Sequence, residues 1–168
     1  MSNRLITKFG AISLAFLMSA CLYSLSGGGG LPKHVKSIAV IPFDNETPNA
    51  ELTTELHQQL RKELASRLGV REAPESRANA VVRGVITRYE ADIPVGFSAD
   101  PTRSSTARRK LQVSVDVEIV DQTTGKMLFQ RKGLSAEGEY AERSEPSGRR
   151  DALKKIIDDI VEGAQSQW

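Results

Sequence analysis

Residues 110–120 alternate between apolar and polar side chains. The apolar members are Leu111, Val113, Val115, Val117 and Ile119, and the polar members between them are Gln112, Ser114, Asp116 and Glu118. Successive side chains of a β-strand point to opposite faces, so this segment predicts a strand with one buried and one hydrated face. The turn sequence at residues 121–126 and the apolar run at 127–140, which weakens after Gly133, predict an antiparallel partner. The fold must therefore contain a sheet that is covered on one face.

Two amphipathic segments are available to cover that face. Leucines recur at every fourth residue, forming one apolar helical stripe: Leu52, Leu56, Leu60, Leu64 and Leu68. We predict Thr47 as the N-cap of this helix, Pro48 as its first residue and Gly69 as its C-terminal cap. A second helix is predicted to begin at Ser144 or Ser147. Its apolar face consists of Leu153, Ile156, Ile157, Ile160, Val161 and Ala164.

Three further apolar segments predict strands at residues 35–43, 70–73 and 80–90, and Gly84 in the last of them indicates a bulge or a close approach. Residues 93–106 interrupt the pattern and predict a long loop. The element order favours an α+β fold. We expect a two-layer sandwich, with a sheet of about four mainly antiparallel strands and two helices packed on one face. The sequence has no internal repeat, and residues 33–168 are predicted to form a single domain.

The N-terminus has the pattern of an export signal. Arg4 and Lys8 precede an apolar run, residues 9–18, which is too short to cross a bilayer and is typical of a signal peptide. Residues 17–21 read Leu-Met-Ser-Ala-Cys and resemble a bacterial lipobox, which predicts cleavage after residue 20 and lipidation of Cys21. The competing interpretation is a secretory leader followed by an incidental cysteine.

The segment after that cysteine predicts a flexible linker at residues 21–32, because it is rich in serine and glycine. The residue after the cysteine is Leu22, whereas an aspartate at this position would resemble an inner-membrane retention signal. We therefore expect a lipid-anchored protein on the periplasmic side of the outer membrane of a Gram-negative cell. Cys21 is the only cysteine, so an intrachain disulfide is excluded.

Charge and motif content argue against nucleic-acid binding and catalysis. The chain has 23 Lys+Arg and 21 Asp+Glu, and the predicted leader holds two of the bases and no acid, so the mature chain is formally neutral. We expect His34 and His57 to face solvent, and Asp116 and Glu118 to lie on a hydrated strand face. The sequence has no zinc-ligand spacing and no phosphate-binding glycine loop, so no cofactor and no metal site are predicted.

Several segments in this order resemble the LptE family of outer-membrane lipoproteins: Cys21 to Ser24, and residues 31–40, 43–47, 80–89 and 115–121. The resemblance covers nearly the whole chain. It implies a non-enzymatic protein that sits within the LptD β-barrel as a plug and assembly partner, in a pair that inserts lipopolysaccharide into the outer leaflet.

The resemblance also implies lipopolysaccharide binding through basic residues, whose charge suits the lipid A phosphates. The candidates in this chain are Arg103, Arg108, Arg109 and Lys110, at the junction of the long loop and the following strand. The alternative for these four residues is a solvated loop with scattered charge.

Two other functions stay open from the sequence. Residues 40–45, Val-Ile-Pro-Phe-Asp-Asn, followed by a helix, also resemble LpoB, a lipoprotein activator of peptidoglycan synthases, and related secretion lipoproteins. A lipoprotein hydrolase is the third alternative, and no motif supports it. Binding to a β-barrel or to a penicillin-binding protein discriminates between the first two functions.

Overall fold

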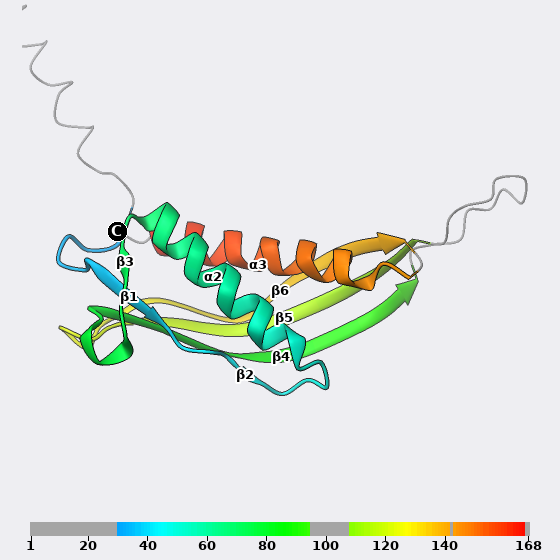
Figure 1. Ribbon diagram of the computed structural model, residues 1–168, viewed down its shortest axis with the longest axis horizontal. Helices are drawn as coiled ribbons and strands as arrows, with labels where there is room; N and C mark the ends of the chain where they lie inside the picture. Colours follow the sequence, from blue (N-terminus) through cyan, green and yellow to red (C-terminus); the bar gives the residue numbers. More distant parts are fainter. Residues whose placement is uncertain (1–29, 95–107, 142, 167–168) are drawn as a thin grey trace, which may run out of the picture.

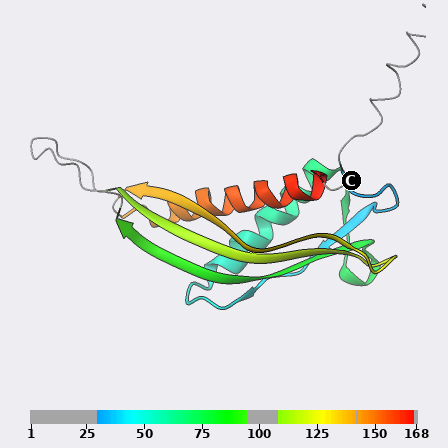
Figure 2. The same cartoon turned by 180° about the vertical axis from the view of Figure 1, so that it is seen from behind.

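The computed structural model describes residues 30–94, 108–141 and 143–166, and Figure 1 shows a curved sheet with two helices on one of its faces. The helices lie side by side in this view and in the reverse view of Figure 2. The elements are β1 (Ser37–Val40), β2 (Asp44–Asn45), α2 (Glu51–Leu68), β3 (Arg71–Glu72), the 3₁₀ turn η2 (Glu75–Arg77), β4 (Ala80–Pro94), β5 (Arg108–Asp121), β6 (Met127–Ala141) and α3 (Glu145–Ser166).

The six strands form one mixed sheet in the order β3-β1-β4-β5-β6, with β2 beside β4. β1 runs parallel to β3 and β4, and β2 runs parallel to β4, whereas β4, β5 and β6 are antiparallel. The predicted α+β class and the placement of both helices on one face are confirmed. The expected strand number was too low, because β2 and β3 contain two residues each and are too short to show a periodicity. The helical crossover through α2 is what makes β1 and β4 parallel.

The three long strands extend further than predicted. β4 continues through the expected start of the loop to Pro94, with an irregularity in its pairing between Glu90 and Ile93. β6 continues to Ala141 past Gly133, which has a φ of 63°. Bulges let a strand change direction while its pairing continues. The apolar residues of β5 from Leu111 to Ile119 all face the helices and are at most 2% exposed, as the alternation predicts.

Helix α2 has its predicted apolar stripe but a different start. Leu52, Leu56, Leu60 and Leu64 are fully buried, and Gly69 ends the helix in the left-handed conformation with a φ of 64°. The predicted cap at Thr47 is wrong, because the N–H and the hydroxyl of Thr47 both donate to Oδ1 of Asn45. This side-chain turn keeps residues 46–49 out of the helix, which begins at Glu51.

Helix α3 packs on β5 and β6, and one glycine of β6 faces one glycine of α3 at the closest point. A Cβ atom on Gly138 of β6 would lie 1.8 Å from the carbonyl oxygen of Gly148 in the first turn of α3. Gly84 of β4 is also a close approach, because a Cβ there would lie 2.4 Å from the ring of Phe43. Gly138 and Gly148 therefore set the distance between the sheet and α3, and Gly84 makes room for the Phe43 ring.

The segment before β1 is bound to the β5–β6 turn through His34 and Asp121. Nε2 of His34 lies 2.6 Å from Oδ2 of Asp121, whose side chain is 1% exposed. Burial alone raises the pKa of Asp121, but hydrogen bonds from the Thr124 hydroxyl, the His34 ring and the Thr123 N–H outweigh it and hold this pKa well below its ordinary range. The His34 side chain is 46% exposed, as expected, and it is also the partner of a buried carboxylate.

We predict that Asp121→Asn lowers the free energy of unfolding by about 1–3 kcal/mol at neutral pH, because it replaces a buried, multiply bonded carboxylate. A lowered native pKa contributes stability above the unfolded value of about 4, and this contribution is lost as the pH falls through the native value. The difference from the wild type should therefore shrink as the pH is lowered below about 5. Urea unfolding at several pH values measures it, and a difference that stays constant with pH would contradict the prediction.

Candidate lipopolysaccharide-binding end of the sheet

Arg108, Arg109 and Lys110 lie together at one end of the sheet, where β5 begins beside the end of β4 and the end of β6. Arg103 lies outside the described residues. In Figure 1 this end is opposite the end at which the chain enters the domain at Gly30. The length of the sheet therefore separates the described part of the basic cluster from the point where the described chain begins.

Each described member of the cluster faces a carboxylate. Nη1 of Arg109 lies 2.9 Å from Oδ1 of Asp92, and Nζ of Lys110 lies 3.1 Å from Oε2 of Glu137. Nη1 of Arg108 lies 3.6 Å from Oε2 of Glu139. These partners come from the neighbouring strands, so the sequence does not show them. The cluster in its tertiary setting is close to neutral.

Arg109 belongs to a fixed network around the bulge of β4. Asp92 has a φ of 60°, which is strained for a residue other than glycine. The backbone N–H of Asp92 donates to the Tyr140 hydroxyl (3.0 Å), and the Tyr140 hydroxyl donates to the Asp92 carboxylate (2.8 Å). The pKa of Asp92 is lowered, mainly by the hydrogen bond from Tyr140 and secondly by the one from Arg109. The pKa of Tyr140 is raised, mainly by burial and secondly by its hydrogen bond to Asp92. Arg109 therefore holds the bulge in place.

Arg108 and Lys110 lie outside the network that holds Arg109, although the Arg109–Asp92 pair is itself exposed, at 39% and 64%. Their partners Glu139 and Glu137 are about half exposed, at 50% and 52%, and the Arg108 side chain is 73% exposed. Exposed ion pairs contribute little, about 0–1 kcal/mol, because water and salt screen them. A phosphate group could therefore replace either carboxylate at small cost.

Beneath this end lies a buried cation that the sequence analysis missed. Arg149 of α3 is 7% exposed, and Nε and Nη2 bind both oxygens of Glu55 at 3.0 and 2.9 Å. Nη2 also lies 2.5 Å from a carboxylate oxygen of Glu51.

A second buried hydrogen bond lies beside Arg149, where Glu145 accepts from the Tyr89 hydroxyl. Burial and this hydrogen bond raise the pKa of Tyr89. One signal was present: Arg149 is four residues before Leu153 and so continues the apolar face of α3.

The other predicted positions serve structure. Asp116 accepts the N–H of Gly133 at 2.7 Å, and Glu118 lies 3.8 Å from Arg83. Both line a shallow depression of about 220 Å³ on the open face of the sheet. His57 is partly buried, and its Nε2 lies 3.0 Å from the carbonyl oxygen of Val40.

The described ranges, residues 30–94, 108–141 and 143–166, contain His34 and His57 but not Cys21. Within these ranges no group of three or more His, Cys, Asp or Glu side chains is arranged to hold a metal ion. In the same part of the chain no helix is long and apolar enough to span a membrane.

Comparisons with known proteins agree with the resemblance seen in the sequence. The model of the LptE family, described as lipopolysaccharide-assembly, matches residues 35–165. No curated protein matches the chain in sequence.

Solved structures show the same fold at low identity. A protein from Xanthomonas campestris is 10% identical, with a TM-score of 0.55 over 82% of this chain and 87% of that one. The PelC dodecamer from Paraburkholderia phytofirmans is 16% identical, with a TM-score of 0.51 over 82% and 95% of the two chains. A hypothetical protein from Chlamydia trachomatis is 12% identical, with a TM-score of 0.51 over 76% and 96%.

Proposed function

This chain belongs to the LptE family of lipopolysaccharide-assembly proteins, and from this premise we propose that it is a non-enzymatic outer-membrane lipoprotein that partners an LptD-like β-barrel. In this proposal it acts as a plug and assembly factor while lipopolysaccharide is inserted into the outer leaflet. The observation that carries the proposal is the extent of the family match, residues 35–165. The match begins before β1 and ends one residue before the end of α3, so it supports a single domain at residues 33–168.

The proposed anchor is a lipid on Cys21, after removal of a signal peptide at residues 1–20. Acyl chains contribute about 0.8 kcal/mol per buried CH₂, so several chains hold a protein firmly at a membrane. Leu31, at the end of the proposed linker, already packs against the core. The anchor would hold this end of the domain at the inner surface of the outer membrane, facing the periplasm.

The proposed lipopolysaccharide site is the end of the sheet that bears Arg108, Arg109 and Lys110, together with Arg103. Guanidinium and ammonium groups suit phosphate, and a guanidinium can bind two of its oxygens at once. The ion pairs of Arg108 and Lys110 are exposed and lie outside the Asp92–Tyr140 network, so we assign the exchangeable contacts to these two. Arg109 is assigned to holding the bulge at Asp92.

We predict that removing the carboxylates and removing the cations have opposite effects on lipopolysaccharide binding. Glu137→Gln with Glu139→Gln frees both cations and should tighten binding by about fivefold, since one exposed pair is worth up to about 1 kcal/mol. Arg108→Ala with Lys110→Ala should weaken it by at least the same factor. Binding of the purified protein to fluorescent lipopolysaccharide measures both. Lys62→Ala on α2 is the matched control, and equal changes in all variants would contradict the assigned site.

Affinity purification of the tagged protein from membranes of its native cells, with mass spectrometry, tests the partnership. We expect a large outer-membrane β-barrel in nearly equal amount to the protein. Recovery of a peptidoglycan synthase without a barrel would instead favour the activator function. Depletion of the protein should reduce surface lipopolysaccharide, and normal surface lipopolysaccharide after depletion would count against the proposal.

A further inference from the structure

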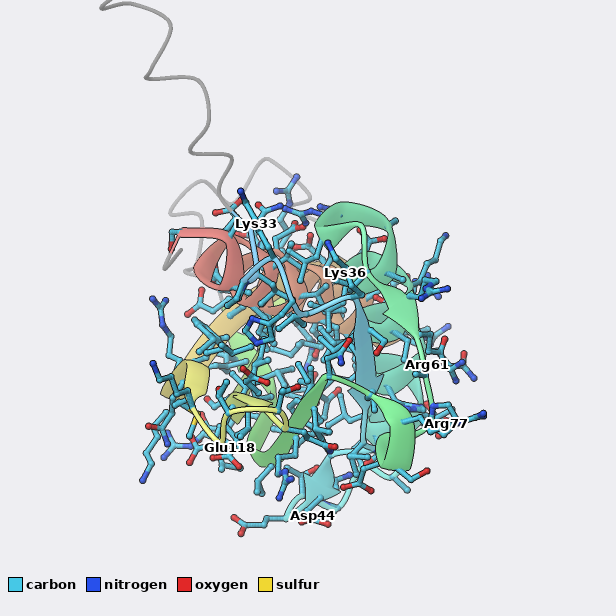
Figure 3. The ribbon with its side chains drawn as sticks, turned by 90° about the vertical axis from the view of Figure 1, so that its left-hand side faces the viewer. Lys33, Lys36, Asp44, Arg61, Arg77 and Glu118 are labelled. Carbon is cyan, nitrogen blue, oxygen red and sulfur yellow. The ribbon has the colours of Figure 1, made fainter. Side chains whose placement is uncertain are left out.

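The face of the sheet opposite the helices is convex. In Figures 1 and 2 the long strands β4, β5 and β6 bow away from α2 and α3. Figure 3 views the sheet from its end and shows Glu118 and Asp44 at the bottom, away from α3 at the top. Near the point where the chain enters the domain, Ala78 packs on Ala39 and Val81 and covers this face. The middle of the convex face is left uncovered.

Short uncharged side chains occupy the centre of this face. The strand register places Ser114 of β5 between Arg88 of β4 and Ser135 of β6. The Ser135 hydroxyl accepts from the side-chain amide of Gln112 at 2.7 Å and from the Ser114 hydroxyl at 3.1 Å. The Thr87 hydroxyl donates to the carbonyl oxygen of Ser114 at 3.2 Å. Because a hydroxyl can both donate and accept, this layer has capacity left for hydrogen bonds to an outside group.

The charged side chains around this centre largely neutralise one another. Nη1 of Arg88 lies 3.7 Å from Oε1 of Glu90, and Nε of Arg83 lies 3.8 Å from Oε1 of Glu118. The charged residues that line the shallow depression beside them are Arg83, Lys132, Asp44, Asp116 and Glu118. The name central open face is used below for Arg83, Thr87, Arg88, Glu90, Gln112, Ser114, Asp116, Glu118 and Ser135.

The outward surface of the helix layer has a different character. The groove between α2 and α3 is lined by Gln59, Ile157 and five charged residues: Lys62, Glu63, Arg150, Lys154 and Asp158. Removing a charge from water costs more than removing a hydroxyl or an amide that finds a new hydrogen bond. The centres of protein interfaces are accordingly depleted of charged residues. Of the two outward faces, the central open face is therefore the one that a partner can cover at the lower cost.

We propose that the central open face lies against the inner wall of the partner β-barrel, with α2 and α3 turned toward the middle of the lumen. The inference rests on the proposed function, which places the domain inside a barrel, and adds which surface contacts the wall. The inner wall of a membrane-spanning barrel is concave and lined by polar side chains, which suits a convex face of hydroxyls and amides. Along β5 the central open face ends at Gln112, so Arg108 and Lys110 remain outside it for lipopolysaccharide.

Photo-cross-linking in the native cells tests this orientation. A benzophenone amino acid replaces Arg88 or Ser135 on the central open face, or Gln58 or Lys154 on the helix layer, all of which are exposed. After irradiation, the variants at Arg88 and Ser135 should be joined to the barrel, at strand residues whose side chains point into the lumen. The variants at Gln58 and Lys154 should not be joined to the wall.

A charge placed in the contact gives a second readout. In Ser135→Asp the new carboxylate can still accept from Gln112 and Ser114, so the fold should be kept, but the carboxylate loses its water against the wall. This variant should copurify about tenfold less barrel than the wild type. Thr54→Asp, at an exposed position of α2, is the matched control and should copurify the wild-type amount. Circular dichroism verifies the folding of both variants.

Copurification without irradiation separates this inference from the proposed function. If the barrel copurifies but is joined only to the variants at Gln58 and Lys154, or equally to all of them, the orientation is wrong and the partnership stands. A wild-type amount of barrel with Ser135→Asp would overturn the orientation in the same way. If no barrel copurifies with the wild type, the proposed function fails and this inference fails with it.

Discussion

Replacing Arg149 with methionine is expected to lower the free energy of unfolding by about 3 kcal/mol. Arg149 is 7% exposed and binds Glu55 through both carboxylate oxygens and Glu51 through one. Removing one partner of a buried ion pair usually costs about 3–5 kcal/mol, because the other partner is left uncompensated. The expected loss lies at the lower end because Glu51 is 72% exposed and regains water easily. Urea unfolding monitored by circular dichroism measures the change.

The choice of methionine separates charge from packing, since its side chain fills much of the same volume. Arg149→Lys is the matched control: it keeps the charge but loses the planar fork that binds Glu55, so its loss should be intermediate. Arg149 joins α3 to α2 near the end of the sheet that bears Arg108. Unchanged stability of Arg149→Met would mean that Glu51 and Glu55 need no cation, and it would contradict the role that we assign to Arg149.

Gly138→Ala is expected to destabilise the protein by about 3 kcal/mol or more. The added Cβ would lie 1.8 Å from the carbonyl oxygen and 2.6 Å from the carbonyl carbon of Gly148. These are backbone atoms, so no side-chain rotation relieves the clash and α3 itself has to move away from β6. Overpacking of a well-packed interior costs about 1–3 kcal/mol and more where the backbone must shift. Thermal and urea unfolding measure this loss.

Gly133 provides a control in the same strand. It has a φ of 63°, and a Cβ there would meet nothing within 4 Å, so only its backbone conformation restricts a substitution. Asparagine tolerates this conformation better than other residues, and Gly133→Asn should therefore change stability by less than about 1 kcal/mol. If the two variants lost equal stability, the close contact between β6 and α3 would not be the cause.

The sequence by itself determined the elements whose side chains repeat with a regular period. The alternation at residues 111–119 identified β5 and its buried face, and the leucine spacing identified α2 with its four buried leucines. These patterns are local, because each residue's position follows from the geometry of its own strand or helix. The α+β class and the placement of both helices on one face followed from them.

Features that depend on a partner distant in sequence were decided only by the tertiary structure. β2 and β3 exist because longer strands offer them a free edge, and the start of α2 moved because Asn45 binds Thr47. The same limit applies to charge. A run of basic residues in the sequence says nothing about the carboxylates of adjacent strands, which pair with Arg108, Arg109 and Lys110. The electrostatic energy of a side chain depends on its neighbours in space, and only the fold determines those neighbours.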